Sequence, residues 1–486
     1  MLKVDPRQAY ALHGCQASRH IELALQSTLP PHTLMQRAGL SLAKLALAIA
    51  PHARHIWIAC GPGNNGGDGL EAAMQLQRWN KDPVVTWLGQ PDTAPPEALA
   101  SYQRAREAGV QFTSTPPETV DLGLDAMLGL GTKLRQPEGQ LAHWINTMNA
   151  SASTILAADL PTGLQGDTGQ LSSTFVKASH TLSLLTLKPG LFTAHGRDAA
   201  GTVWFDDLGS GLEQAGPLPY PATAWLSGAS PQKERAPSSH KGSYGDVAIV
   251  GGAVGMTGAA LLAASAALHA GAGRVYVSLL DGGSLKVDLL QPELMFSPFE
   301  LLNQISTTLV CGCGGGLAVG DLLPQVLSTP APLVLDADAL NAIARDSALE
   351  EQLVARAASD CQTVMTPHPL EAARLLGLTT IQVQNDRLQA ATQLAQRFRC
   401  TVVLKGSGTV IAAPGRTPVI NGTGNARLAT AGTGDVLAGL VGAKLASGDH
   451  AFEAACKACY QHGALADHWP VKHAITASAL ARALGA

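Results

Sequence analysis

The segment Cys60–Gly69, "CGPGNNGGDG", holds five glycines in ten residues, together with two amides and one carboxylate. The apolar run "HIWIA" (55–59) precedes it, and "GLEAAMQLQRW" (69–79), with apolar residues at helical spacing, follows it. Glycine at this density is typical of backbone that turns sharply or approaches another group closely. A strand, a glycine-rich turn and a helix in this order predict one unit of a parallel sheet that carries helices on its faces.

The same alternation continues through the first half of the chain. Apolar runs predict strands at 83–89, 120–128, 154–159 and 178–186, and helical spacing predicts helices within 8–50, at 95–109 and at 141–150. The pattern weakens at 206–240, which is rich in Pro, Gly and Ser, so a domain boundary is expected near 226–236. We therefore expect a first α/β domain at 1–226 and a linker at 227–235.

The second half, 236–486, starts the alternation again. Strands are expected at 245–252, 274–280, 307–312, 331–338, 363–369 and 401–406, with a helix at 256–273 and a glycine loop that opens a helix within 429–448. The two halves share this alternation of strands and helices but have no residue-level repeat. The chain is therefore predicted to contain two different α/β domains, as its length of 486 residues favours.

Composition excludes several classes of function. The formal net charge of −4 gives no basic field, so nucleic acid is not expected as a partner. No apolar stretch is long enough to span a bilayer, and the first residues lack the apolar core of a secretory signal. The eight cysteines are scattered without the paired spacing of a zinc site, which favours reduced thiols and a cytoplasmic protein without membrane contact.

Polar side chains mark the ends of three predicted strands in the first half. Asn65 lies in the glycine-rich segment, Asp125 on a strand, and Asp159 and Thr162 in a turn that Pro161 fixes and that we expect to expose both side chains. Ligands of parallel sheets bind at the carboxyl ends of the strands. Amide, carboxylate and hydroxyl oxygens suit a hard cation better than zinc. Each aspartate alone could equally be a helix cap.

Three segments in this order, "GPGNNGGDG" (61–69), "DAMLGLGT" (125–132) and "DLPTG" (159–163), resemble the NAD(P)HX epimerase family over roughly 10–220. The resemblance implies a Rossmann-like, three-layer α/β/α fold that binds hydrated nicotinamide nucleotides. It implies substrate contacts from Asn64, Asn65, Gly66, Gly67, Asp68, Gly129, Leu130, Gly131, Thr132, Lys133, Leu134, Arg135 and Asp159. It also implies a K⁺ site at Asn65, Asp125 and Thr162, with Thr162 where the family usually has Ser.

The second half has its own glycine loop, Gly432-Thr433-Gly434-Asp435, at the expected start of a helix. Backbone N–H groups at such a position face an anion, and a carboxylate beside them is how a phosphoryl-transfer enzyme places a base for an attacking hydroxyl. Asp435 could instead be a cap favoured by the helix dipole. "KGSGT" (405–409) offers a lysine and flexible backbone for a nucleotide phosphate, and His368 lies between two prolines, where a lone histidine is more often structural.

Together with "HKGSYG" (240–245), "TGAA" (257–260), "CGCGG" (311–315) and "DADAL" (336–340), these motifs resemble the ADP-dependent NAD(P)HX dehydratases of the ribokinase-like fold, over roughly 236–486. The resemblance implies that substrate contacts Asp435, His368, Gly314 and Ala259. It implies nucleotide contacts at Lys405, Gly406, Ser407, Gly408, Thr409 and Gly434. Cys313 stands where the family loop commonly has Pro, which we expect to make this loop less rigid.

The two resemblances together indicate a bifunctional NAD(P)H-hydrate repair enzyme. Its expected substrates are NADHX and NADPHX, with ADP, Mg²⁺ and K⁺ as co-substrate and ions. Asp435 is the candidate base for the C6 hydroxyl, Asp159 the candidate acid–base group of the epimerase, and Lys133 a candidate for the phosphates. A homo-oligomer is expected. The alternatives are a ribokinase-like kinase for a vitamin alcohol, and a nucleotide-sensing role for the first half.

Overall fold

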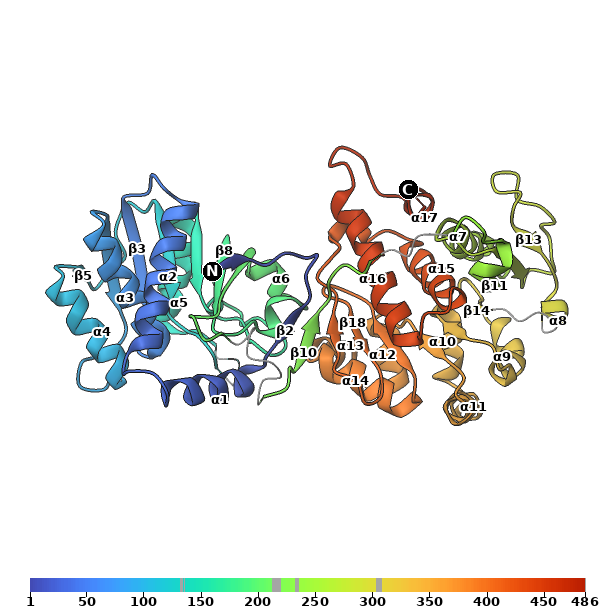
Figure 1. Cartoon of the computed structure of the whole chain (residues 1–486), viewed down its shortest axis with the longest axis horizontal. Helices are drawn as coiled ribbons and strands as arrows, with labels where there is room; N and C mark the ends of the chain where they lie inside the picture. Colours follow the sequence, from blue (N-terminus) through green and yellow to red (C-terminus); the bar gives the residue numbers. More distant parts are fainter. Residues whose placement is uncertain (132–133, 135, 212–219, 232–235, 303–307, 486) are drawn as a thin grey trace. The chain divides into compact units, whose positions relative to one another are not determined.

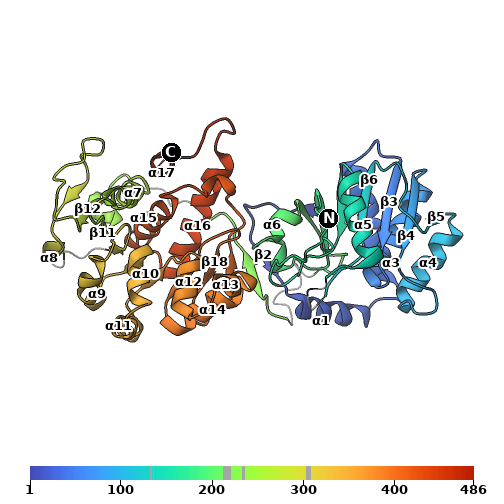
Figure 2. The ribbon, with the colours of Figure 1, turned by 180° about the vertical axis from the view of Figure 1, so that it is seen from behind.

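A computed structural model describes residues 1–131, 134, 136–211, 220–231, 236–302 and 308–485. The described chain divides into two compact units, one of 1–5 and 10–226 and the other of 6–9 and 227–486. Figure 1 shows the elements of both units, and Figure 2 shows them from behind.

The first unit is built on an eight-stranded sheet of order β1-β9-β8-β7-β6-β3-β4-β5. All neighbours are parallel except the edge pair β1 and β9. The strands are β1 (Leu2–Lys3), β3 (His55–Cys60), β4 (Asp82–Trp87), β5 (Gln111–Thr113), β6 (Leu122–Ala126), β7 (Ile155–Ala158), β8 (His180–Leu184) and β9 (Thr202–Asp206), and β2 (Tyr10–Leu12) pairs with β10 (Ala224–Leu226). The helices are α1 (Cys15–Gln26), α2 (Thr33–Ile49), α3 (Asn64–Arg78), α4 (Pro96–Glu107), α5 (Gly139–Ser151) and α6 (Gly196–Ala199).

Alternate side chains of β3 explain the three layers of the first unit. Ile56 and Ile58 pack into a core with α2 and α3, whereas Trp57 and Ala59 pack into a second core with α5. Successive side chains of a strand point to opposite faces, so one apolar run supplies both cores. The predicted Rossmann-like three-layer α/β/α fold is therefore confirmed.

The second unit has a sheet of order β13-β12-β11-β14-β15-β16-β17-β18-β19, parallel from β13 to β17 and antiparallel thereafter. Its strands are β11 (Asp246–Gly251), β12 (Arg274–Leu279), β13 (Met295–Phe296), β14 (Thr308–Cys311), β15 (Leu333–Leu335), β16 (Thr363–Met365), β17 (Thr401–Leu404), β18 (Val410–Ala412) and β19 (Val419–Ile420). Its helices are α7 (Thr257–His269), α8 (Phe299–Leu302), α9 (Val319–Ser328), α10 (Ala337–Ile343), α11 (Ser347–Ala358), α12 (Pro369–Leu376), α13 (Thr380–Asn385), α14 (Arg387–Phe398), α15 (Thr433–Ala446), α16 (Ala451–His468) and α17 (Ala477–Ala483).

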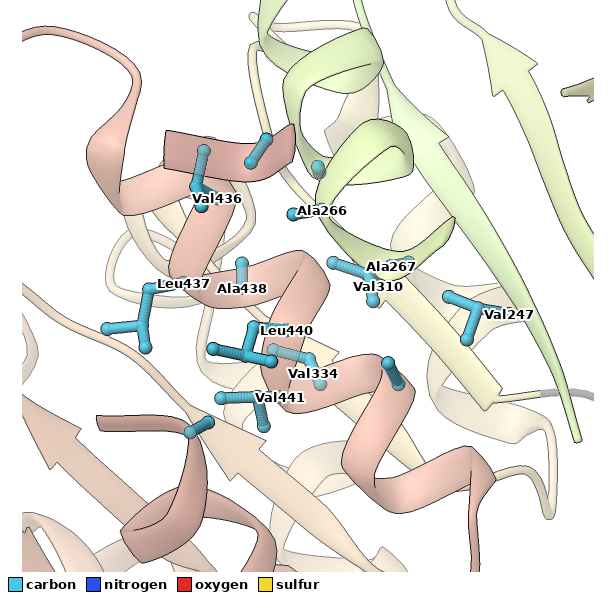
Figure 3. Packing of buried hydrophobic residues seen from close by; sticks show 14 of the residues in the cluster. Val247, Ala266, Ala267, Val310, Val334, Val436, Leu437, Ala438, Leu440 and Val441 are labelled. Atoms are coloured by element: carbon cyan, nitrogen blue, oxygen red, sulfur yellow. The ribbon is translucent and has the colours of Figure 1, made fainter. Parts of the chain in front are cut away.

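Helices α7 and α15 cover one face of this sheet. Figure 3 shows Ala266 and Ala267 of α7 and Leu440 of α15 packed with Val310 and Val334 of the strands beneath. The helices α9 to α12 and α14 pack against the other face in a separate core. Small side chains on α7 and α15 let the two helices approach closely: a Cβ on Gly439 would lie 2.0 Å from the backbone oxygen of Ala263. This layered α/β unit confirms the fold class expected for the second half.

The glycine-rich segment of the first unit differs from the expected turn. Helix α3 begins at Asn64, so most of the segment is helical. A Cβ at Gly61 would lie 1.7 Å from the oxygen of Met127, and one at Gly66 would lie 2.0 Å from the oxygen of Gly61. These glycines therefore mainly allow segments of the chain itself to approach one another closely. The predicted helical region 8–50 is also interrupted, because β2 occupies Tyr10–Leu12.

Candidate functional sites

A cavity of about 1040 Å³ opens at the carboxyl ends of the strands of the first unit. Helices α1, α2 and α3 and the segments after β6, β7 and β8 line it. Of the predicted substrate residues, eight do so: Asn64, Asn65, Asp68, Gly129, Leu130, Gly131, Leu134 and Asp159. Gly66 and Gly67 do not, because they face Gly61 and Met35 inside the unit. Thr132, Lys133 and Arg135 lie outside the described residues.

Asp159 forms a buried ion pair with Lys188, which sequence reasoning did not single out. Lys188 is 1% exposed, and its Nζ also donates to the backbone oxygen of Leu184 at 2.8 Å. Asp159 accepts from the Leu184 amide at 3.1 Å and has a left-handed backbone φ of 64°. Non-glycine residues in this region concentrate at functional sites. The sequence signal that could have identified Lys188 is its position as a charged residue immediately after the run "SLLTL" (183–187).

The turn that carries Asp159 and Thr162 does not expose them, contrary to our expectation. Asp159 is 7% and Thr162 0% exposed. The hydroxyl of Thr162 donates to Asp125 at 2.7 Å, and its amide donates to the other carboxylate oxygen at 2.7 Å. Both polar groups are thus drawn inward by hydrogen bonds to neighbouring strand ends.

The structure brings two of the three predicted cation ligands together. Burial raises the pKa of Asp125 to about 6, because no cation among the described residues pairs with it. Asn65 lines the neighbouring cavity, and its Nδ2 is buried without a partner among the described residues. The Asp125 carboxylate and the Thr162 hydroxyl are oxygen donors of the kind that a hard cation prefers, whereas the unpaired Asn65 Nδ2 is a donor and does not itself point to a cation.

Two further carboxylates of the cavity, those of Asp68 and Glu22, have surroundings that differ from those of Asp159. The pKa of Asp68, on α3, is raised well above its usual range by burial and by four surrounding carboxylates, of which Glu22 contributes most. The pKa of Glu22, on α1, is also raised, chiefly by burial. The cavity therefore combines one carboxylate held by a lysine with two whose pKa values are raised, chiefly by burial.

Asp435 of the second unit lies in the first turn of α15, after Gly432 with a φ of 88°. Burial, followed by repulsion from Asp336, raises the pKa of Asp435 to about 6, while the nearby Cys313 thiol opposes this. The same thiol donates to Asp336 Oδ2 at 3.9 Å. At neutral pH this carboxylate is ionised and more basic than an ordinary aspartate. Such a group suits general base catalysis.

Lys405 follows β17 and reaches the same place. Its Nζ donates to Asp336 Oδ1 at 2.7 Å, and the Thr366 hydroxyl donates to the same oxygen at 2.8 Å. A Cβ on Gly434 would lie 3.4 Å from this Nζ. The predicted nucleotide residues Lys405 and Gly434 are thus neighbours, and Asp336, which was not assigned a role, holds Lys405 in position.

The loop that contains Cys313 is held by its backbone. The oxygens of Cys313 and Gly314 accept from the amides of Gly252 at 3.0 Å and Ala253 at 2.7 Å. A Cβ on Gly314 would lie 2.9 Å from the Cβ of Ala259, so these two predicted substrate residues adjoin. The loop therefore keeps its position without the family's proline.

His368 caps helix α12. Its Nδ1 accepts from the amides of Leu370 at 3.1 Å and Glu371 at 3.3 Å, and its Nε2 lies 3.2 Å from Glu371 Oε1. Burial lowers the pKa of the imidazole, so the neutral ring caps the helix. The structure gives His368 a structural role, and its contact with substrate stays a prediction.

Each unit therefore carries carboxylates and a lysine at the carboxyl edge of a parallel sheet, where the ligands of such sheets bind. Family models described as "NAD(P)H-hydrate dehydratase" and "YjeF-related protein N-terminus" match residues 247–485 and 31–190. The bifunctional NAD(P)H-hydrate repair enzyme Nnr of Escherichia coli (strain K12) is 36% identical, covering 90% of this chain and 85% of that protein. The chain belongs to the family of bifunctional NAD(P)H-hydrate repair enzymes, which combine an epimerase with a dehydratase domain.

Other relatives match the second unit. The ADP-dependent (S)-NAD(P)H-hydrate dehydratase of Neisseria meningitidis (serogroup B, strain MC58) is 46% identical over 48% of this chain and 80% of that protein. The solved ADP/ATP-dependent NAD(P)H-hydrate dehydratase from Bacillus subtilis, co-crystallised with ATP and Mg²⁺, is 28% identical with a TM-score of 0.43, covering 52% of this chain and 92% of that one. The resemblance inferred from the sequence is confirmed, and the kinase alternative is not favoured. Among the described residues, no helix is both long and apolar enough to cross a membrane.

Proposed function

We propose that this chain restores hydrated NAD(P)H. The first unit interconverts (R)- and (S)-NAD(P)HX, and the second dehydrates the (S) epimer with ADP, releasing AMP and phosphate. The observation that carries the proposal is Asp435, a carboxylate with its pKa raised to about 6 at the N-terminus of α15, beside Lys405. ADP is the proposed nucleotide because the Neisseria relative is described as ADP-dependent.

In the second unit, Asp435 accepts the proton of the C6 hydroxyl while that oxygen attacks the terminal phosphoryl group of ADP. The backbone N–H groups of 432–434 and the ammonium of Lys405 face the negative charge that develops. AMP leaves first. Phosphate then leaves C6, assisted by the lone pair of the ring nitrogen, and a proton leaves C5, so that the dihydronicotinamide ring is restored.

In the first unit, Asp159 acts as an acid–base group at C6. Its ion pair with Lys188 and its bond to the Leu184 amide hold the carboxylate in position at the cavity wall. Lys188 is a positioning residue, since it is 1% exposed and acts through Asp159. Asn64, Asn65 and the loop 129–131 supply polar groups along the same cavity for the rest of the nucleotide.

The proposal includes two ions. Asp125 and Thr162, with Asn65, would hold K⁺, which would neutralise the buried Asp125 carboxylate. Asp336 and Asp435 would lie beside Mg²⁺ carried by the nucleotide, and Mg²⁺ supplies charge neutralisation of the phosphates. Ligand atoms of Asp336 and Asp435 lie within 4.8 Å of each other, which fits a shared cation.

The first experiment follows recovery of NADH absorbance after the purified chain is mixed with Mg²⁺, ADP and a mixed-epimer NADHX preparation. Recovery of the whole pool faster than spontaneous epimerisation is expected. Recovery of one epimer alone would remove the epimerase half of the proposal, and no recovery with ADP or ATP would overturn it. Light scattering and cell fractionation would test the predicted homo-oligomer and its cytoplasmic location.

A further inference from the structure

Inversion of configuration at C6 requires both an acid and a base in the first unit, and a single carboxylate does not supply both. If the C6 hydroxyl leaves as water from one face of the ring, an acid must donate a proton on that face. Water must then add to the opposite face, where a base must accept a proton. A two-face exchange of this kind requires acid–base groups on two walls of the cavity.

The cavity is lined by carboxylates from two different elements. Asp159 lies in the turn after β7, and Asp68 lies on α3, the helix that follows β3. Strand β6 separates β7 from β3, so the two carrier strands are about 10 Å apart. Both carboxylates line the same cavity of about 1040 Å³, which is large enough to admit a nicotinamide ring.

The two carboxylates have opposite surroundings. The Asp159 carboxylate accepts from the Lys188 ammonium and from the Leu184 amide. The carboxylate of Asp68 forms no hydrogen bond or ion pair with any described residue. Glu22 on α1, Glu71 on α3, Glu97 on α4 and Asp159 surround it, and with burial they raise its pKa. Two neighbouring carboxylates, one paired with a lysine and one surrounded by other carboxylates, have the contrasting environments found for an acid and a base at one site.

We propose that Asp68 is the second catalytic group of the epimerase site, a carboxylic acid that protonates the C6 hydroxyl on the ring face opposite Asp159. This inference rests on the function proposed above. The C6–O bond breaks, its electron pair leaves with water, and the ring nitrogen forms a C=N bond to C6. Water adds to the other face, its proton passes to Asp159, and the C=N electron pair returns to nitrogen. The reverse turnover, or proton exchange with solvent in the cavity, resets both carboxyl groups.

The decisive variant is Asp68→Asn, which keeps the shape of the side chain but has no acidic proton. Epimerisation of (R)-NADHX is expected to fall at least about 100-fold, with a smaller change in KM. Dehydration of preformed (S)-NADHX by the same preparation is expected to stay unchanged, which reports folding and substrate quality. Asp68→Glu, which restores a carboxylic acid, is expected to recover part of the rate.

Isotope exchange tests the chemistry independently. In H₂¹⁸O, wild-type enzyme is expected to place ¹⁸O at C6 with each inversion, above the spontaneous background. An Asp68→Asn rate within threefold of wild type, or inversion without ¹⁸O, would overturn the inference. The inference would also be overturned if Glu22→Gln abolished inversion and Asp68→Asn did not, because the acid would then be a residue of α1. Wild-type protein with no epimerase activity would instead refute the proposed function.

Discussion

Each of the two units places carboxylates and a lysine at the carboxyl edge of its sheet, yet the lysines have different partners. In the first unit, Lys188 holds the predicted acid–base residue Asp159. In the second, Lys405 holds Asp336 and leaves the predicted base Asp435 with its pKa raised to about 6. The position of the lysine therefore decides which carboxylate has a paired cation, and in the second unit the predicted base Asp435 is not that carboxylate.

The largest expected effect tests the unpaired carboxylate of the second unit. Asp435→Asn removes the base, so dehydratase turnover is expected to fall on the order of 10²–10⁴-fold. Epimerase activity should not change, and the matched variant Asp360→Asn, at an exposed position, should retain both activities. Steady-state kinetics on each epimer measure this. A loss of turnover below tenfold would show that another residue is the base, and the contrast drawn between the two units would then be wrong.

The paired carboxylate of the first unit is tested through stability. Lys188→Met leaves Asp159 without its buried partner, which is expected to lower the free energy of unfolding of this unit by about 3–5 kcal/mol. Adding Asp159→Asn should recover much of that loss, because the uncompensated charge is removed. Urea denaturation of the two variants measures it, and equal stability of Lys188→Met and wild type would show that the pair is solvated.

A smaller effect is expected at the candidate K⁺ site. Thr162→Val removes the hydroxyl that donates to Asp125 and accepts from the Leu128 amide, a loss of about 1–3 kcal/mol. Thr162→Ser keeps the oxygen and should resemble wild type. Melting temperatures in KCl and in NaCl measure both the loss of stability and the response to K⁺. The melting temperature of wild type should be higher in KCl than in NaCl. An equal response of all three proteins to K⁺ would remove Thr162 from the site.

The smallest effect is a shift in pH dependence. Dehydratase kcat/KM should fall as the pH drops through about 6, because Asp435 must be ionised to accept a proton. The Cys313 thiol lowers the pKa of Asp435, so Cys313→Ala should move this acidic limb to higher pH. Cys400→Ala, another buried thiol, is the control. A limb that stays in place in Cys313→Ala would show that the thiol does not bond the ionised carboxylate.

Much of the architecture could be predicted because apolar periodicity reflects burial directly. Strands β3, β7, β11, β14 and β17 coincide with apolar runs in which alternate residues enter opposite cores. The sequence could not show that Gly61 and Gly66 serve internal packing, because a glycine close to protein and one close to ligand look alike. It also suggested a solvent-exposed Asp159, whereas hydrogen bonds in the folded chain bury it.

The sequence by itself determined the two α/β units, the family and the positions of Asp159 and Asp435, because local motifs follow strands that periodicity identifies. Only the tertiary structure decided the electrostatic state of these groups. Lys188 is 29 residues from Asp159, and Lys405 is 69 residues from Asp336, so neither pairing can be read along the chain. Burial and the nearest charge set a carboxylate's pKa, and both arise only when distant strand ends meet at one edge of a sheet.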